Sequence, residues 1–91
     1  MKTILITGAS SGIGCALAKI YAENSHNLVL VARREEKLKD LKEELEKKHS
    51  ISVIIEVMDL SKKENLVILS LKYKNIDVLI NNAGLGQYGK F

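Results

Sequence analysis

Three glycines stand close together near the start of the chain, in the segment TGASSGIG at residues 7–14. The segment separates an aliphatic run from a stretch with helical periodicity, so we expect a strand-to-helix turn. A helix N-terminus favours a phosphate, because its unpaired N–H groups and its dipole both point at the anion. Glycine allows positive φ, close approach of backbone to phosphate, and tight packing of helix on strand. We therefore predict a pyrophosphate site in which Gly8, Gly12 and Gly14 divide these tasks and Ser10 or Ser11 adds a hydroxyl contact.

Two other glycine motifs do not fit this spacing. A Walker A loop would need Gly-Lys-Ser/Thr at positions 13–15, where the chain has Ile13, Gly14 and Cys15. A G-x-G-x-x-G pattern started at Gly12 meets Leu17 in place of its third glycine. The spacing is T-G-x-x-x-G-x-G instead. The structural alternative is a turn whose glycines serve packing alone.

The segments that must position this turn alternate between strand and helix. Continuous apolar runs near residues 4–6, 28–32, 53–55 (followed by Val57) and 78–80 are typical of parallel strands buried on both faces. The order β-α-β-α-β-α-β predicts an α/β fold, the N-terminal half of a Rossmann-like doubly wound parallel sheet. We expect the strand order 3-2-1-4, one half-domain over residues 1–91, and a ligand at the switch point between strands 1 and 4.

Three helices are predicted between these strands. The first is expected to bury Ile13, Leu17, Ile20 and Tyr21 on one face. The second, over residues 35–48, has an apolar stripe and acid-before-lysine pairs four residues apart. The third is expected to begin with a capping box in which Ser61 and Glu64 each satisfy a free N–H. Its inward-facing residues are predicted to be Leu66, Leu69 and Tyr73.

The end of the second predicted strand bears on the choice of nucleotide. NAD-specific folds place an acid there, about 20 residues beyond the glycines, to bind the adenosine ribose. Here Ala32 is followed by Arg33 and Arg34. An acid would repel a 2′-phosphate, whereas an arginine fork binds one through paired charged hydrogen bonds. We therefore predict NADP(H), with NAD(H) as the less favoured cofactor; pairing of both arginines with the acids at 35 and 36 is the structural alternative.

Two segments of the chain resemble the signatures of a known family. Residues 7–14 are similar to the cofactor motif of the short-chain dehydrogenase/reductase family, and Asn81-Asn82-Ala83-Gly84, after the fourth strand, resembles its second signature. The resemblance covers the whole chain, which looks like the N-terminal third of a family member. Many relatives that prefer NADP also carry a basic residue inside the turn, where this chain has Ser11, so the preference depends on the arginines.

The resemblance implies further contacts to the cofactor. The Asp59 carboxylate would accept from the adenine amino group, and Leu60 would contribute backbone. Asn81 and Ala83 would lie beside the adenosine and ribose, and Asn82 is expected to be structural. The predicted cofactor-binding residues are therefore Gly8, Ser10, Ser11, Gly12, Ile13, Gly14, Arg33, Arg34, Asp59, Leu60, Asn81, Ala83 and Gly84.

Family members exchange hydride between the nicotinamide and a small carbonyl or alcohol substrate, using a Tyr-x-x-x-Lys pair. None of the tyrosines here is followed by such a lysine. We therefore assign no catalytic residue and expect the 91-residue chain alone to be inactive. Two hypotheses remain: a truncated piece of an NADP-dependent reductase, or a non-catalytic nucleotide-binding or assembly module. The first is favoured by the expected end of the chain inside a loop.

Composition restricts the partners. Apolar residues make up 46% and charged residues 27%, a globular balance. Aromatic residues are only 4%, and most basic residues neighbour acids, which argues against a nucleic-acid surface. No metal site is predicted.

A single cysteine and the lack of a long apolar segment lead us to expect a cytoplasmic protein without a membrane partner. A free edge on the fourth strand predicts a homodimer or higher homo-oligomer.

Overall fold

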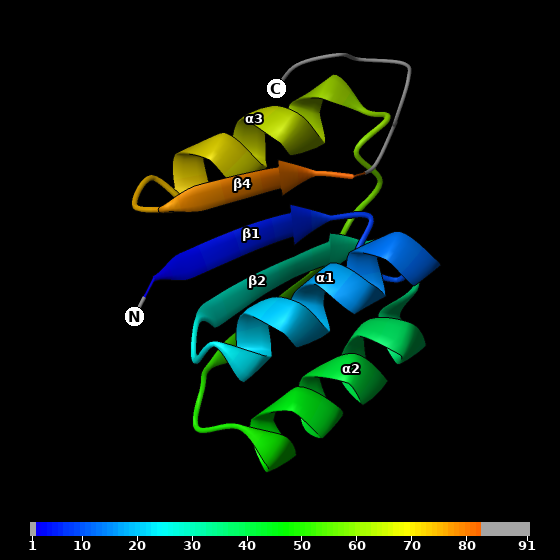
Figure 1. Ribbon diagram of the computed structural model, residues 1–91. Helices are drawn as coiled ribbons and strands as arrows, with labels where there is room; N and C mark the ends of the chain where they lie inside the picture. Colours follow the sequence, from blue (N-terminus) through cyan, green and yellow to red (C-terminus); the bar gives the residue numbers. More distant parts are fainter. Residues whose placement is uncertain (1, 83–91) are drawn as a thin grey trace.

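The computed structural model describes residues 2–82. Its elements are β1 (Thr3–Thr7), α1 (Gly12–Glu23), β2 (Asn27–Ala32), α2 (Glu35–Lys48), β3 (Val53–Val57), α3 (Lys63–Lys72) and β4 (Val78–Asn81) (Figure 1). The four strands are parallel and lie in the order β3-β2-β1-β4. The predicted fold class, strand order and switch point between β1 and β4 are confirmed. Ala83 and Gly84 lie outside the described residues.

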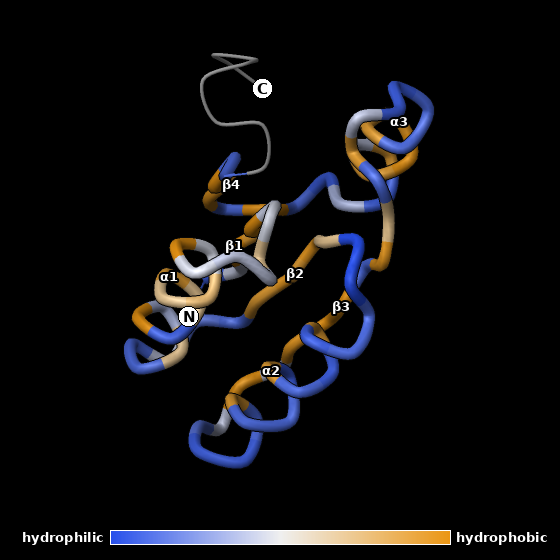
Figure 2. Tube along the Cα trace, turned by 90° about the vertical axis from the view of Figure 1, so that its right-hand side faces the viewer, coloured by the Kyte–Doolittle hydropathy of each residue, from blue (hydrophilic) through white to orange (hydrophobic). Residues whose placement is uncertain are grey.

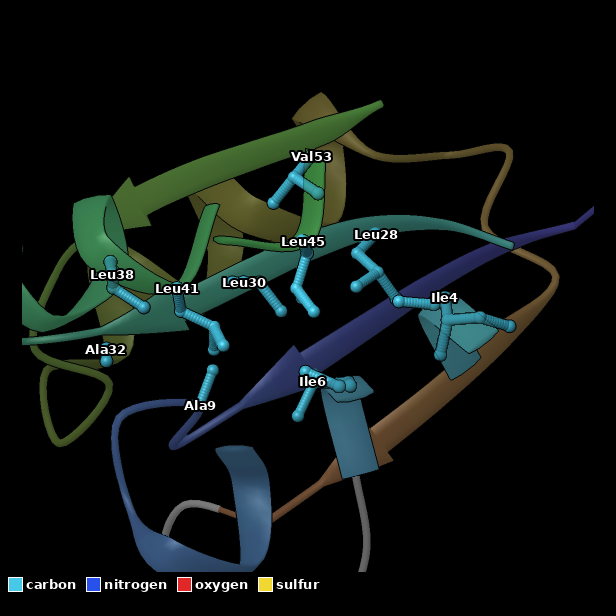
Figure 3. Close-up of a cluster of buried hydrophobic side chains, with 12 residues drawn as sticks. Ile4, Ile6, Ala9, Leu28, Leu30, Ala32, Leu38, Leu41, Leu45 and Val53 are labelled. Carbon is cyan, nitrogen blue, oxygen red and sulfur yellow. The ribbon is translucent and has the colours of Figure 1, made fainter. Parts of the chain in front are cut away.

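The sheet lies between two helical layers (Figure 2). On one face, Ile4 and Ile6 of β1 pack with Leu28 and Leu30 of β2 against α1 and α2 (Figure 3). Neighbouring residues of the strands point to the other face, where Leu5, Val29 and Val31 pack against Leu69 of α3. Because both faces of β1 and β2 are covered, these strands are apolar throughout, as buried parallel strands require.

The predicted apolar face of α1 is correct only in part: Leu17 and Tyr21 are partly buried against the core, but the fully buried residues of the helix are small. Its buried residues are Gly14, Ala18 and Ala22, four apart along one stripe. Ile13 and Ile20 are instead 60% and 53% exposed. The physical reason is the close approach of the helix to the strands, which leaves room for a hydrogen atom or a methyl group at the contact.

Helix α2 has the predicted bounds and buries Leu38, Leu41 and Leu45. Two of the predicted acid–lysine pairs form, Glu35–Lys39 at 3.3 Å and Glu44–Lys48 at 3.5 Å.

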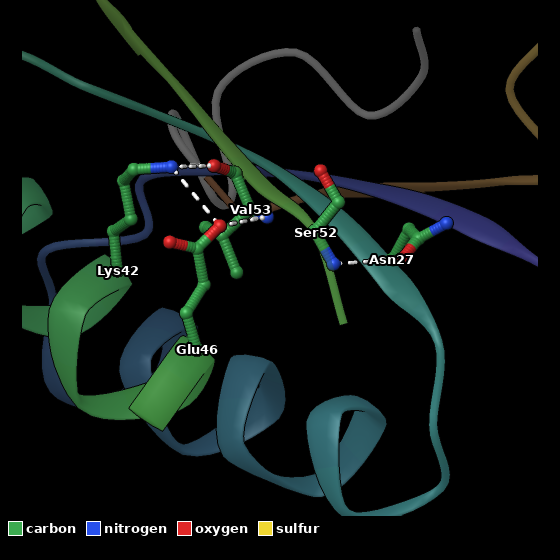
Figure 4. A network of polar contacts seen from close by, with 5 residues as sticks. All are labelled: Asn27, Lys42, Glu46, Ser52 and Val53. Carbon is green, nitrogen blue, oxygen red and sulfur yellow. Dashed lines mark hydrogen bonds and ion pairs between the residues drawn. The ribbon is translucent and has the colours of Figure 1, made fainter. Parts of the chain in front are cut away.

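The same helix also holds the start of β3. Glu46 Oε2 accepts from the Val53 N–H at 2.9 Å, and Lys42 Nζ donates to the Val53 carbonyl (Figure 4). Two side chains of α2 thus occupy backbone groups of Val53 that would otherwise be free on an edge strand.

The predicted capping box of the third helix does not form. Helix α3 begins at Lys63 with Lys62 as its N-cap, and no side chain caps it. The Ser61 N–H donates instead to Asp59 Oδ1 at 3.0 Å, so Ser61 belongs to a turn before the helix. Leu69 is buried as predicted, and Leu66 and Tyr73 are half-buried.

Helix α3 is tied to β3 through Glu56. Lys72 Nζ lies 2.7 Å from Glu56 Oε2, and the Tyr73 hydroxyl donates to the same oxygen. Burial alone would raise the pKa of Glu56, but these two hydrogen bonds outweigh it and lower the pKa. Burial and the Glu56 carboxylate raise the pKa of Tyr73. None of the helices within residues 2–82 is long and apolar enough to cross a membrane.

Candidate nucleotide-binding site

The three glycines of the turn after β1 have different surroundings. Gly8 has φ of 64°, a conformation that L side chains rarely adopt. Gly14 lies against the turn: a β-carbon there would collide with the Gly8 carbonyl oxygen and stand 2.9 Å from Ala9 Cα. A β-carbon on Gly12 would meet no atom of the described residues within 4 Å. Gly8 therefore serves the turn, Gly14 serves packing, and Gly12 keeps an open face at the start of α1.

The Ser11 side chain organises the beginning of α1. As the N-cap, its Oγ accepts from the Gly14 N–H at 3.1 Å and donates to the Gly8 carbonyl at 2.8 Å. The Ser11 N–H also donates to Gly8, at 3.1 Å. A helix start has four N–H groups without partners inside the helix. Two are satisfied here, and those of Gly12 and Ile13 have no acceptor within residues 2–82.

The end of β4 is bonded directly to this turn. The Asn82 side-chain amide donates to the Gly8 carbonyl at 3.1 Å and to Ser11 Oγ at 2.8 Å. The Asn82 N–H donates to Thr7 Oγ1 at 2.9 Å, and Thr7 Oγ1 donates to Asn81 Oδ1 at 3.1 Å. The predicted structural role of Asn82 is thus confirmed. The part played by Thr7 was missed; the signal was a threonine at a buried strand end.

The two arginines after β2 are exposed. Within the described residues neither forms an ion pair, and Glu35 pairs with Lys39. Arg34 is the N-cap residue of α2, with no side-chain capping bond. The expected alternative, in which Arg33 and Arg34 pair with the acids that follow them, is therefore not the arrangement seen.

Asp59 follows β3 beside Arg33. The Met58 N–H donates to the Ala32 carbonyl at 3.0 Å and so joins the two strand ends. The hydrogen bonds from Ser61 lower the pKa of Asp59, and the charges of Arg33 and Lys62 lower it further. The carboxylate is therefore ionised at neutral pH. The next residue, Leu60, is half-buried and packs on the α3 side of the sheet.

The described candidate residues share one edge of the sheet. The glycine turn follows β1, Arg33 follows β2, Asp59 lies two residues after β3, and Asn81 ends β4. These are the carboxyl ends of parallel strands, where open α/β sheets bind ligands. Within residues 2–82 no group of three or more metal-ligating side chains is present. The edge therefore offers free N–H donors, exposed guanidinium groups and a fixed carboxylate.

Comparison with known proteins identifies the family. The sequence profile of the short-chain dehydrogenases matches residues 2–91. The chain belongs to the short-chain dehydrogenase family. A relative from Schizosaccharomyces pombe, an NADP-dependent 3-hydroxy acid dehydrogenase, is 47% identical over 92% of this chain and 34% of its own length. An 11-beta-hydroxysteroid dehydrogenase from Pinus massoniana is 42% identical over 94% of this chain and 25% of its own.

Two solved dehydrogenase structures have the same fold over this part of the chain. The enzyme from Sphingobium yanoikuyae, in complex with NADPH, superposes with a TM-score of 0.87 at 39% identity, covering 100% of this chain and 37% of that one. The bulky-bulky ketone specific alcohol dehydrogenase from Comamonas testosteroni gives a TM-score of 0.85, also at 39% identity, over 100% and 38% of the two chains. The present chain thus spans between a quarter and two fifths of the length of these four dehydrogenases.

Proposed function

We propose that this chain is the NADP(H)-binding N-terminal part of a short-chain dehydrogenase/reductase, occupying residues 1–91 as one half-domain. The whole protein would transfer hydride between NADP(H) and a carbonyl or alcohol substrate. The observation that carries the proposal is the start of α1. There the N–H groups of Gly12 and Ile13 have no acceptor within the described residues, and Gly12 presents an open face.

This helix start fits a pyrophosphate. Its two N–H groups and the helix dipole favour an anion, and the missing side chain of Gly12 lets phosphate oxygens approach the backbone. The Ser11 hydroxyl already uses its single proton on Gly8 and accepts from Gly14 and Asn82. Ser11 would therefore contribute by shaping the turn, whereas Ser10 would be the serine that adds a hydroxyl contact.

The arginines give the preference for NADP(H). Arg33, with Arg34 in support, would bind the 2′-phosphate through charged hydrogen bonds, and neither is engaged in an ion pair within residues 2–82. The Schizosaccharomyces pombe relative is named NADP-dependent, and the Sphingobium yanoikuyae neighbour was solved with NADPH. Both names support the same cofactor here.

The remaining cofactor contacts are proposed from the family resemblance. Asp59 would accept from the adenine amino group with a carboxylate that Ser61 already fixes. Leu60 would contribute backbone at the same position. Asn81, with Ala83 and Gly84 beyond the described part, would lie beside the adenosine and ribose.

Hydride transfer itself would need residues that these 91 do not supply. The nicotinamide would provide the hydride when bound, while this chain would hold the adenosine and pyrophosphate in place. A non-catalytic nucleotide-binding or assembly module remains the alternative. Carbonyl-dependent NADPH oxidation by the chain alone, lost on Gly12→Val, would contradict the proposal that these residues bind the cofactor without catalysing hydride transfer.

The free, half-buried Cys15 is compatible with a reducing compartment, and the cytoplasm is the proposed location.

Titration calorimetry with NADPH and NADH tests the proposed cofactor. A charged hydrogen-bonded contact contributes about 1.5–3 kcal/mol, so NADPH should bind about 10- to 100-fold more tightly than NADH. Arg33→Ala should remove most of this difference, whereas the exposed control Lys74→Ala should retain it. Equal affinity of the unmodified chain for the two cofactors would refute the NADP(H) preference.

We also propose self-association through β4. Within residues 2–82, β4 pairs with β1 alone, and Leu79 on its α3 face is 41% exposed. The outward side of α3 adds Val67, Ile68 and Leu71, which are at least half exposed. A free strand edge beside exposed aliphatic side chains favours pairing with a second copy across a two-fold axis.

A further inference from the structure

Three charged side chains come from neighbouring turns at the carboxyl ends of β2 and β3. Arg33 follows β2, and Asp59 lies two residues after β3. The hydrogen bond from the Met58 N–H to the Ala32 carbonyl, 3.0 Å, places these two turns side by side. Lys62 is the third member, because its N–H donates to the Asp59 carbonyl at 3.3 Å.

The turn from Asp59 to Lys62 is fixed by its own hydrogen bonds. Asp59 Oδ1 accepts from the Ser61 N–H at 3.0 Å, and the Asp59 carbonyl accepts from Asn65 Nδ2 at 2.8 Å. The Oδ1 atom and the backbone carbonyl oxygen of Asp59 therefore both accept hydrogen bonds within the turn. This fixes the backbone of Lys62 relative to the carboxylate and leaves the lysine side chain exposed.

The stability of α3 does not account for a lysine at this position. Lys62 is the N-cap residue, where Ser, Thr, Asp and Asn are preferred, and it makes no side-chain capping bond. A positive charge at a helix N-terminus also meets the positive end of the dipole. No carboxylate within residues 2–82 lies within ion-pair distance of Lys62 or Arg33. The charges of both nevertheless act on the Asp59 carboxylate.

We propose that Lys62 is a specificity-determining residue, a further cation in addition to Arg33 and Arg34 that favours the 2′-phosphate of NADP(H) over the free hydroxyl of NAD(H). This inference rests on the proposed function and adds a residue to it. A 2′-phosphate carries a charge of about −1.5 to −2 at neutral pH. Ionised Asp59 offsets part of the attraction that Arg33 exerts on this phosphate. Lys62 compensates Asp59 and gives the cluster a net positive charge.

The size of the effect follows from exposure. The cluster is exposed to water, where two unit charges a few ångströms apart interact by roughly 1 kcal/mol or less. For a phosphate of nearly two charges, we expect Lys62 to contribute about three- to tenfold in affinity at low ionic strength, where screening is weak. A ligand without the 2′-phosphate should gain nothing from it.

The experiment uses the 91-residue chain and two probes, adenosine 2′,5′-bisphosphate and adenosine 5′-monophosphate, titrated by calorimetry at low salt. Lys62→Ala should weaken binding of the bisphosphate by about three- to tenfold and leave the monophosphate unchanged. Lys62→Arg should retain the preference. Lys63→Ala is the matched control, since Lys63 is adjacent and exposed but its charge is not among those acting on Asp59.

The ratio of the two affinities separates the outcomes. A ratio unchanged by Lys62→Ala, or an equal loss for both probes, overturns the inference while leaving the proposed function in place. An equal effect from Lys63→Ala also overturns it, because the effect would then belong to general surface charge. An unmodified chain that binds neither probe refutes the proposed function itself, and the role of Lys62 with it.

Discussion

The side-chain amide of Asn82 lies 2.8 Å from Ser11 Oγ and donates to it. This bond joins the residue after β4 to the N-cap of α1, between the two segments by which the family is recognised. The same amide donates to Gly8, whose positive φ begins the turn. The two signatures are therefore one hydrogen-bonded unit, in which the second supports the conformation of the first.

Replacing Asn82 should destabilise the whole domain. Asn82→Ala removes both side-chain bonds and leaves the partly buried Gly8 carbonyl with fewer donors. Such losses cost about 1–3 kcal/mol. Urea denaturation followed by circular dichroism should show this decrease in the free energy of unfolding. The exposed control Asn75→Ala should change it by less than about 0.5 kcal/mol. Equal stability of the two variants would show that the amide bonds contribute nothing.

A substitution at Gly14 should lower the stability of the fold, whereas a substitution at Gly12 should prevent nucleotide binding and leave stability nearly unchanged. Gly14→Ala places a methyl group into the Gly8 carbonyl and should cost about 1–3 kcal/mol or more in unfolding free energy. Gly12→Val meets open space and should leave the helix content and unfolding midpoint nearly unchanged. It should nevertheless abolish NADPH binding, because the valine covers the helix start.

The unfolding midpoint and an NADPH titration, measured on both variants, provide the test. A Gly12→Val variant with unaltered affinity would mean that the turn has a structural role alone. A Gly14→Ala variant as stable as the parent would contradict the close contact of α1 with the turn.

The contact of Glu46 with β3 should make stability depend on pH. The hydrogen bond from Val53, followed by that from Lys42, lowers the pKa of Glu46 below 4.5. The stabilisation is therefore complete above the unfolded-state pKa and is lost as the pH falls through the lower folded-state value.

Thermal unfolding of Glu46→Gln from pH 7 to pH 3 measures this effect. The variant should melt at most about 4–8 °C below the parent at pH 7, since exposed pairs contribute at most about 1 kcal/mol, and the gap should narrow in acid. Glu43→Gln, also exposed and on the same helix, should show no such gap. A difference independent of pH would rule out the charge of Glu46 as its cause.

The β4 edge predicts self-association that a single charge disrupts. Light scattering over a concentration series should show the chain forming dimers or larger assemblies. Leu79→Lys should shift the chain toward the monomer, since a charge at an edge strand opposes pairing. Lys74→Ala serves as the surface control. A parent chain that stays monomeric and folded at high concentration would disprove the proposed contact.

Much of the fold could be predicted because several signals agree. The apolar runs that became β1 and β2 are continuous since both faces are covered, and α2 carries both a leucine stripe and charged pairs. The site could be anticipated because parallel strands bring their carboxyl ends to one edge. Local pattern and global topology thus indicate the same arrangement.

The errors arose where contact distance, rather than hydrophobicity, decided the outcome. In α1 the large side chains of Ile13 and Ile20 outweighed Gly14, Ala18 and Ala22 in the periodic pattern, yet only small residues fit so near the sheet. At the start of α3, Ser61 and Glu64 have capping spacing, but Asp59 takes the Ser61 N–H first. The sequence alone does not reveal which of two competing acceptors is nearer.

The bond from the Asn82 N–H to Thr7 Oγ1 closes a separation of 75 residues. Contacts this distant in sequence form slowly during folding, because the entropy of the intervening loop must be lost before they stabilise anything. The turn after β1 is made of neighbouring residues, but the amide that supports it belongs to Asn82, the last residue described. The turn therefore reaches its full set of hydrogen bonds only when β4 has joined the sheet. An anion that binds this turn only in the folded chain would raise the free energy of unfolding, and a tighter-binding anion would raise it more.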